Sequence, residues 1–393
     1  MLLIDAFAAY QNVAFPETES PQDMRPGDIS DLYIHEGERM RFRVPGGLLE
    51  FGDPVDRQRF VDTFSLAIPR FEERMAQKGR LEDSYDCPVA RIRQSSNGTE
   101  GGFETHLDQI QIRVRMTVYQ HSQGRKYAAV VRFGSDKAPA LQDLGLEPMA
   151  RSLMEELRGG VLVTGAAHAG KTFTMTAMMD HIAHSADGHL VTIEDPIELP
   201  LRPDRCVVSQ QEVGSDVQSF DSGVIGSLRQ SPIALMVGEI RDSATAHAAI
   251  RVLQSGHFLV AGIHAADAAE ATGTFSALLE PARRDDERAQ LSRRLSGVIH
   301  QVLVPSIDAR NWCVACEVIS FRSNPALRSK LAAGDFEGLK AAVRNEEAGT
   351  FHLNRSLLRL VVDGRIKPGD AFVASYDQAQ LKQMLQRAGL EQE

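Results

Sequence analysis

The sequence has few cysteines, little tryptophan and no long apolar run. Its 393 residues include 4 cysteines and 1 tryptophan. So few scattered cysteines do not make a disulfide framework, which favours a reducing compartment. No stretch reaches the ~20 consecutive apolar residues that a membrane span needs. The opening MLLIDAFAAYQ also lacks the basic segment and long apolar core of a secretory leader, so we expect a cytoplasmic protein.

An excess of positive charge is absent too. The net charge of −10 provides no overall attraction to nucleic acid or to an anionic membrane. Nucleic acid is therefore not the expected partner. The net charge does not exclude a local basic patch. With 43% apolar and 24% charged residues, the composition is that of an ordinary globular protein. A chain of 393 residues is long for one core, so we expect two domains and an appendage.

One pair of cysteines has the spacing of a metal or redox motif. Cys313 and Cys316 form a CxxC within WCVACEVISF, where apolar residues roughly alternate as in a strand. No second CxxC completes a four-ligand zinc site, and Cys87 and Cys206 stand far away. We interpret the pair as buried strand positions, with metal or redox use as the alternative.

Residues 29–119 have the pattern of a small α/β domain. LYIHE, MRFRV and DQIQIRVRMTVY alternate with period two, residues 55–77 have helical spacing, and Gly46-Gly47 suits a hairpin turn. In the third strand the apolar side chains share one face, which leaves Arg113 and Arg115 together on the other. Arg132 lies near the end of the following strand, YAAVVRF. A solvated polar face is the simplest interpretation of these arginines.

The pattern of apolar residues changes near Met149, after the loop GSDKAPALQDLGLEP. VLVT, HLVTIED, IALMVGE and FLVAGIH are short apolar runs separated by helical stretches, which predicts a buried parallel sheet with crossover helices. For one helix Ser243 is the expected N-cap and Gly256 the expected stop. Beyond Pro305 we expect the CxxC strand and three amphipathic helices, at 328–344, 353–362 and 376–390.

The strongest motif is GAAHAGKT, which satisfies the eight-position P-loop pattern between the strand VLVT and the helix FTMTAMMDHI. Its two glycines let backbone N–H groups surround phosphate oxygens at a helix N-terminus. Lys171 is expected to reach the β- and γ-phosphates, and the Thr172 hydroxyl to ligate Mg²⁺. The motif thus predicts ATP and Mg²⁺ as cofactors, and the predicted nucleotide-binding residues are Gly165, Ala166, Ala167, His168, Ala169, Gly170, Lys171 and Thr172.

Two further strands end in acidic residues. IALMVGE places Glu239, and HLVTIED places Glu194 and Asp195, at the carboxyl edge of the sheet, where open α/β sheets bind ligands. Two carboxylates at a magnesium–phosphate centre suit hydrolysis, since one can hold the metal's water shell while the other orients the attacking water. The alternative is that these acids merely begin solvated loops. The residues alone do not divide the two roles.

At this point the sequence resembles a family. VTIEDPIE, VGEIRD and GHFLVAGIH, following a P-loop, are similar to the Asp box, Walker B and His box of the ATPases of type II and type IV secretion and type IV pili. The resemblance spans about residues 29–385. It implies that Glu194 is the catalytic glutamate and that Glu239 is the Walker B acid, holding Mg²⁺ through water. His257 and His264 would be the His-box pair at the nucleotide or at a subunit interface, whereas a lone histidine is more often structural.

The resemblance also gives the N-terminal arginines a role. ISDLYIHEGERMRFRVPGG resembles the family's opening segment, and RVRMTVY and AVVRF resemble its arginine-bearing strands. Arg113, Arg115 and Arg132 would then reach ATP from the small domain. An arginine that stabilises a transferring phosphoryl group can contribute about 10³-fold or more in rate. A structural or solvated role for each arginine is the alternative.

The chain resembles the retraction branch more than the assembly branch. It lacks the paired-CxxC insert and the large N-terminal region of assembly ATPases, and NPALRSKLAAGDF (324–336) is similar to the C-terminal segment of retraction ATPases. A type IVB secretion or conjugation ATPase is also compatible. The P-loop departs from the family's glycine- and serine-rich version, so His168 must adopt backbone geometry that suits glycine. We therefore expect an active but slow enzyme.

Together these features predict an α/β chain with a small N-terminal PAS-like α/β domain (1–138), a linker (139–148), a RecA-like ATPase core (149–305) and a C-terminal strand with a helical extension (306–393). The resemblance implies a homo-hexamer, peripheral to the inner membrane, that acts on a platform protein, with a related partner ATPase as a further candidate partner. The alternatives are a nucleotide-gated scaffold without useful turnover and a nucleic-acid translocase, which would need a basic channel.

Overall fold

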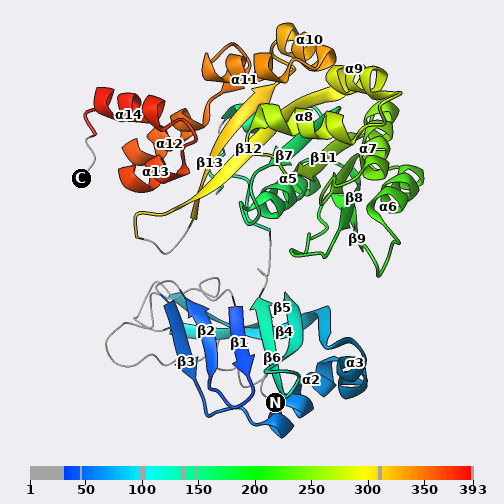
Figure 1. Cartoon of the computed structure of the whole chain (residues 1–393), viewed down its shortest axis with the longest axis vertical. Helices are drawn as coiled ribbons and strands as arrows, with labels where there is room; N and C mark the ends of the chain where they lie inside the picture. Colours follow the sequence, from blue (N-terminus) through cyan, green and yellow to red (C-terminus); the bar gives the residue numbers. More distant parts are fainter. Residues whose placement is uncertain are drawn as a thin grey trace. The chain divides into compact units, whose positions relative to one another are not determined.

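The structure is a computed structural model that describes residues 31–44, 47–96, 103–133, 138–142, 144–146, 148–308 and 312–390. The chain divides into two compact units (Figure 1): the first comprises residues 1–136 and Glu198–Pro200, and the second comprises residues 137–197 and 201–393. In the described part, no helix combines the length and the apolar character that crossing a membrane would require. The opening MLLIDAFAAYQ, on which the prediction of no secretory leader rests, lies outside the described residues.

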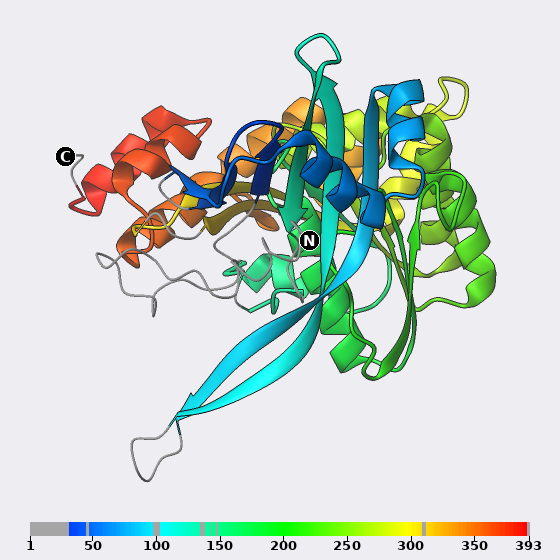
Figure 2. The same ribbon diagram turned by 90° about the horizontal axis from the view of Figure 1, so that it is seen from below.

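The first unit contains a six-stranded antiparallel sheet with the order β3-β2-β1-β6-β5-β4. Its strands are β1 (Asp31–His35), β2 (Met40–Val44), β3 (Gly47–Phe51), β4 (Arg80–Ser96), β5 (Phe103–His121) and β6 (Lys126–Phe133). Helices α2 (Arg57–Ala67) and α3 (Phe71–Lys78) cover one face, and Phe60, Phe64 and Phe71 fill the core between helices and sheet. Because β6 pairs only with residues 114–121 of β5, the far ends of β4 and β5 continue as a two-stranded ribbon (Figure 2).

Two sequence predictions for this unit need correction. The single helix expected over residues 55–77 is two helices, because Pro69 cannot donate a backbone hydrogen bond and Ile68 before it is extended. Gly47 belongs to β3 and lies opposite Val44, so it is not part of the turn as predicted. Residues 45 and 46, and with them the predicted turn position Gly46, lie outside the described part.

The second unit contains an eight-stranded sheet with the order β14-β13-β12-β7-β11-β10-β8-β9. Six of these strands run parallel: β7 (Gly160–Thr164), β8 (Gly188–Glu194), β9 (Cys206–Glu212), β10 (Ala234–Val237), β11 (Phe258–Ile263) and β12 (Leu295–Pro305). Strands β13 (Trp312–Ser320) and β14 (Thr350–Phe351) extend the β12 side antiparallel. The four apolar runs predicted to be strands are β7, β8, β10 and β11, which confirms the parallel-sheet prediction.

Helices cover both faces of this sheet. Alternate residues of β7, β8, β10 and β11 belong to two different cores, because successive strand side chains point to opposite faces. One core includes α4 (Pro148–Ser152) and α5 (Lys171–Ser185). The other includes α6 (Phe220–Ser227), which runs into the 3₁₀ turn η1 (Leu228–Gln230), and α7 (Ser243–Ser255), α8 (Ala268–Leu278) and α9 (Arg284–Arg294). This doubly covered sheet is the predicted RecA-like core.

The C-terminal helices divide into two groups. Helices α10 (Pro325–Ala333) and α11 (Phe336–Arg344) join the core of α7 and α8. Helices α12 (Leu353–Val362), α13 (Pro368–Ala374) and α14 (Gln378–Arg387) pack together beside β12 and β13 around a core of their own (Figure 1). Cys313 and Cys316 are buried free thiols in β13, which confirms the strand interpretation of the CxxC.

Caps explain where the predicted helix boundaries of this unit were wrong. The N-cap of α7 is Asp242 rather than Ser243, because the Asp242 carboxylate accepts the N–H of Thr245; the predicted stop at Gly256 is confirmed. The helix expected over 328–344 breaks where left-handed Gly334 ends α10 and Asp335 caps α11. The last helix begins at Gln378, two residues after the predicted start, since Asp377 caps it.

Candidate functional site

Four neighbouring parallel strands end at one edge of the second unit's sheet, and each end carries a predicted site residue. The P-loop follows β7, Glu194 ends β8, Glu239 follows β10 and His264 follows β11. Since β7, β11, β10 and β8 are consecutive in the sheet, these segments lie side by side. This is the edge at which open α/β sheets bind ligands.

The backbone of the P-loop is tightly constrained. Gly165 has φ 151°, and a Cβ atom there would lie 2.5 Å from the carbonyl oxygen of Gln301 in β12. Gly170, the N-cap of α5, is left-handed with φ 79°. His168 has φ 63°, so it adopts the glycine-like geometry expected of it, at a cost of roughly 1 kcal/mol or more for a residue with a Cβ. Gln301 is fully buried and donates a 2.6 Å hydrogen bond from Nε2 to the Ala169 carbonyl, which fixes the far side of the loop.

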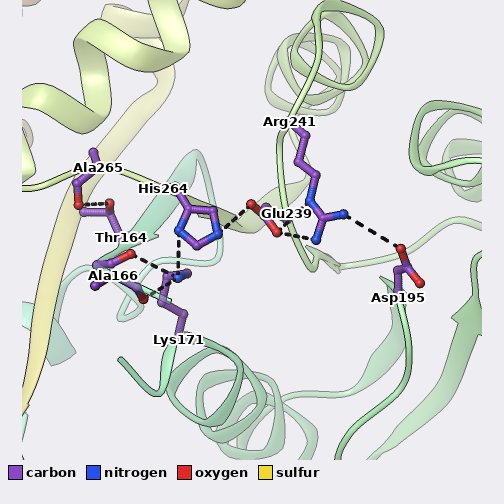
Figure 3. Close-up of polar contacts among 9 residues, drawn as sticks. Thr164, Ala166, Lys171, Asp195, Glu239, Arg241, His264 and Ala265 are labelled. Atoms are coloured by element: carbon purple, nitrogen blue, oxygen red, sulfur yellow. Dashed lines mark hydrogen bonds and ion pairs between the residues drawn. The ribbon is translucent and has the colours of Figure 1, made fainter. Parts of the chain in front are cut away.

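The Lys171 ammonium group is held by its own loop. Its Nζ donates to the carbonyl oxygens of Gly165 at 3.0 Å and Ala166 at 2.9 Å, and lies 3.3 Å from Nδ1 of His264 (Figure 3). Partial burial lowers the pKa of Lys171, and the nearby charge of Glu239 opposes that effect. Thr172 follows in the first turn of α5 and is half-buried. The loop thus places a cation and a hydroxyl at one helix N-terminus, where anions bind.

Glu239 lies between two basic side chains. One carboxylate oxygen lies 2.9 Å from Nε2 of His264, and the other accepts two hydrogen bonds from Arg241, at 2.7 Å to Nη2 and 2.8 Å to Nε (Figure 3). Bonding to Glu239 raises the pKa of Arg241, whose Nη1 also lies 4.0 Å from Asp195. A chain of polar side chains therefore runs from Lys171 to Asp195 across the strand ends. Arg241 was missed by the sequence reasoning, although its place in GEIRD, two residues after Glu239, is the signal that could have found it.

Glu194 has a more enclosed environment than Glu239. Its side chain is 2% exposed, against 15% for Glu239. Its Oε1 accepts a 2.6 Å hydrogen bond from the Thr192 hydroxyl and a 3.1 Å bond from Nε2 of Gln210. A buried carboxylate costs free energy unless such donors satisfy it. The two carboxylates thus differ: Glu194 accepts hydrogen bonds from a hydroxyl and an amide, whereas Glu239 is paired with the Arg241 guanidinium and contacts the His264 imidazole.

The structure does not bring His257 to this edge. His257 precedes β11, where its Nδ1 lies 2.6 Å from the Ser255 hydroxyl, whereas His264 follows the same strand. A six-residue strand such as Phe258–Ile263 spans about 20 Å, so the two histidines lie at opposite edges of the sheet. A direct contact of His257 with this site, one of the two roles expected for it, is therefore excluded within one chain.

The three predicted arginines all belong to the first unit. The Arg132 side chain is 53% exposed, and its Nε donates a 2.9 Å hydrogen bond to the buried carboxylate of Asp31. Arg113 and Arg115 are on β5, opposite Asp86 and Ser84 of β4, and their side chains lie outside the described part. That these arginines reach a nucleotide stays a prediction.

The fold and this edge define the class of protein. A RecA-like sheet that presents a P-loop lysine, a glutamate at the end of one strand and a second carboxylate after another is the core of a P-loop ATPase. The profile of the family "Type II/IV secretion system protein" matches residues 30–357, and the chain belongs to this family.

Several relatives cover most of the chain. The type IV pilus retraction ATPase PilT of Pseudomonas aeruginosa is 30% identical over 343 residues, 87% of this chain and 93% of that protein. PilU of the same organism is 30% identical over 65% of this chain and 67% of its own length. The crystal structure of the pilus retraction motor PilT with bound ADP superposes with a TM-score of 0.74 at 25% identity, covering 91% of this chain and 96% of that one. The resemblance to secretion and pilus ATPases, nearest the retraction branch, is confirmed.

Proposed function

We propose that this chain is a hexameric ATPase motor that drives the retraction or dynamics of a type IV pilus, or the related step of a secretion machine. The observation that carries the proposal is the convergence of Lys171, Glu194 and Glu239 at one sheet edge. The similarity to PilT and PilU over most of the chain supports the pilus assignment. The partner would be a platform protein of the inner membrane, at whose cytoplasmic face the ring would work.

Each residue of the site has a role in this proposal. Thr172 and Glu239 offer the hydroxyl and carboxylate oxygens that Mg²⁺ prefers, and Glu239 would act through a metal-bound water. Bound Mg²⁺ would supply charge neutralisation at the phosphates. Lys171 would leave the two P-loop carbonyls and His264 to hold the β- and γ-phosphates. Glu194, enclosed and fixed, would orient the attacking water and accept its proton.

The first unit would complete the nucleotide site. In the proposed domain division, residues 1–138 precede a linker (139–148), the ATPase core (149–305) and the C-terminal extension (306–393), and hydrolysis would change the angle between domains. Arg113, Arg115 and Arg132 would stabilise phosphate charge. For Arg132 this requires exchanging Asp31 for phosphate, a partner of higher charge.

The test is ATP hydrolysis by the purified chain beside Lys171→Ala and Glu194→Gln, with native mass recorded in the same buffer. We expect turnover by a six-chain assembly, which Lys171→Ala should abolish and Glu194→Gln should reduce to a small residual rate. Lys171→Ala should also lose ATP binding, whereas Glu194→Gln should retain it, because the carboxylate acts on water and not on the nucleotide. Lys382→Ala, at an exposed position of α14, is the matched control and should hydrolyse ATP as the wild type does.

A second candidate is a nucleotide-gated scaffold. It is favoured by His168, whose left-handed backbone gives this P-loop a strained position. Tight ATP binding by the wild type, with no turnover under any condition, would contradict the motor and support the scaffold.

A further inference from the structure

Strand β9 is the outermost parallel strand of the sheet and lies beside the strand that ends in Glu194. In the register of the pair, Thr192 is opposite Gln210 and Glu194 is opposite Glu212. The side chains of Thr192, Glu194, Gln210 and Glu212 consequently share one face of the sheet, because side chains alternate along a strand. Gln210 lies on a strand that carries none of the predicted phosphate- or metal-binding residues, yet it bonds directly to the glutamate proposed to act on water.

Two hydrogen bonds fix the orientation of the Gln210 amide. Its Nε2 donates to Glu194 Oε1 at 3.1 Å, and its Oε1 accepts the backbone N–H of Leu201 at 2.8 Å. A carboxylate only accepts and a backbone N–H only donates, so a flipped amide would face both partners with the wrong group. The amide therefore acts as a rigid link between the glutamate and the segment that returns to β9.

The same segment is held at a second point. After Glu194 the chain leaves the sheet, and the backbone N–H of Ile197 donates a 3.1 Å hydrogen bond to Oε2 of Glu212. Glu212 thus anchors the loop near its start, at Ile197, and Gln210 anchors its middle, at Leu201, both from the face of β9 that carries the bond to Glu194. Thr192 supplies the other donor to Glu194 Oε1, from within β8 itself. Gln210 is accordingly a donor to the carboxylate from the neighbouring strand, whereas Thr192 donates from the same strand.

We propose that Gln210 is a positioning residue for ATP hydrolysis, which acts by holding the Glu194 carboxylate in the orientation that aligns the attacking water. This inference rests on the proposed function. In the reaction, the water oxygen forms a bond to the γ-phosphorus while the bond from that phosphorus to the ADP oxygen breaks. The water's proton passes to the Glu194 carboxylate and later to solvent. Because Gln210 would act through the Glu194 carboxylate, we expect its effect in turnover and not in nucleotide affinity.

Two substitutions separate the donor from the rest of the side chain. Gln210→Met keeps the length and removes both hydrogen bonds. Gln210→Glu keeps an acceptor for Leu201 but removes the donor and puts a second carboxylate beside Glu194. Because small misplacements of catalytic groups cost up to about 100-fold, we expect both variants to lower kcat by about 10- to 100-fold, with the Kd for ATP within about twofold of wild type. Gln211→Met, next on β9 and on the opposite face, is the matched control and should behave as wild type.

A double-mutant comparison separates positioning from general loosening of the sheet. If Gln210 acts through Glu194, adding Gln210→Met to Glu194→Gln should lower the residual rate by less than about threefold, because the carboxylate to be positioned is already gone. The inference would be overturned if Gln210→Met lowered the rate as much in the Glu194→Gln background as in the wild type. It would also be overturned if Gln210→Met alone weakened ATP binding as much as it lowered kcat. A wild type without turnover would refute the proposed function itself. Turnover in Gln210→Met equal to that of Gln211→Met would refute only the role of Gln210.

Discussion

Glu317 and His300 form a buried pair of titrating residues with opposite effects on stability. They lie opposite each other on β13 and β12, and their side chains are 1% and 3% exposed. Glu317 accepts the N–H of Ala268 at 3.0 Å and the hydroxyl of Tyr376. Burial raises the pKa of Glu317 from 4.5 to about 7 and, with Asp267 opposing the change, lowers the pKa of His300 from 6.5 to about 4.

As pH rises, the two pKa shifts change the free energy of unfolding in opposite directions. Between pH 4.5 and 7 the native state holds the Glu317 proton that the unfolded chain has lost, so this contribution is full below pH 4.5 and is lost as pH rises through 7. Between pH 4 and 6.5 the imidazole of His300 binds a proton in the unfolded chain but is neutral in the native state. That contribution is full above pH 6.5 and is lost as pH falls through 4. At about 1.4 kcal/mol per pKa unit, each amounts to about 3 kcal/mol, so they nearly cancel where they overlap.

Glu317→Gln should expose this balance. The amide oxygen can still accept from Ala268 and the amide NH₂ group can donate to the Tyr376 hydroxyl oxygen, but the side chain no longer titrates. The free energy of unfolding of the second unit in Glu317→Gln, minus that in wild type, should therefore increase by about 3 kcal/mol as the pH is raised from 4.5 to 7.5. Urea titrations at constant ionic strength measure it, followed by circular dichroism and by the fluorescence of the single tryptophan, Trp312, which belongs to this unit.

The control is Glu337→Gln, at an exposed position of α11, whose stability should follow that of wild type across the same pH range. A difference between Glu317→Gln and wild type that stays constant to within about 0.5 kcal/mol, a typical limit of such comparisons, would refute the reasoning. It would mean that Glu317 is ionised throughout and that its hydrogen bonds offset the cost of burial.

Three further substitutions have defined outcomes. Gly165→Ala puts a Cβ 2.5 Å from the Gln301 carbonyl, so a fluorescent-ADP titration should show at least about tenfold weaker binding, equivalent to about 1.4 kcal/mol; unchanged affinity would mean that the loop adapts freely. Asp242→Ala removes the cap of α7 and should lower the free energy of unfolding by about 1 kcal/mol in urea, whereas Ser243→Ala should leave it nearly unchanged. Phe275→Ala empties a fully buried position and should cost about 3–5 kcal/mol, read as a lower Tm; a loss below about 1 kcal/mol would contradict tight packing there.

The sequence predicts those features that depend on short stretches of chain. The four apolar runs, the P-loop and the acids at two strand ends are local patterns, and parallel strands necessarily gather their carboxyl ends at one edge. Helix boundaries are less predictable, because Asp242 and Ser243 are both good caps and only the backbone geometry decides between them. The break between helices α2 and α3 at Pro69 could have been predicted, since residues before proline avoid helical geometry.

Contacts between strands could not be predicted in the same way. The bond between Gln210 and Glu194 depends on the register of β8 and β9, which no pattern within either segment specifies. The bond between Arg241 and Glu239 depends on a turn after β10 that brings the two side chains together. His257 fails for the opposite reason: it stands near His264 in the sequence, but an extended strand separates them in space.

The Lys171 ammonium group donates hydrogen bonds to two carbonyl oxygens of its own loop and lies 3.3 Å from Nδ1 of His264. In the proposed function, every phosphate bond that Lys171 forms would replace one of these contacts, so the net gain in free energy would be smaller than that of the new contact alone. Tight binding of ATP and fast release of ADP would place opposing demands on Lys171. The two loop carbonyls would offer its ammonium group other acceptors during ADP release.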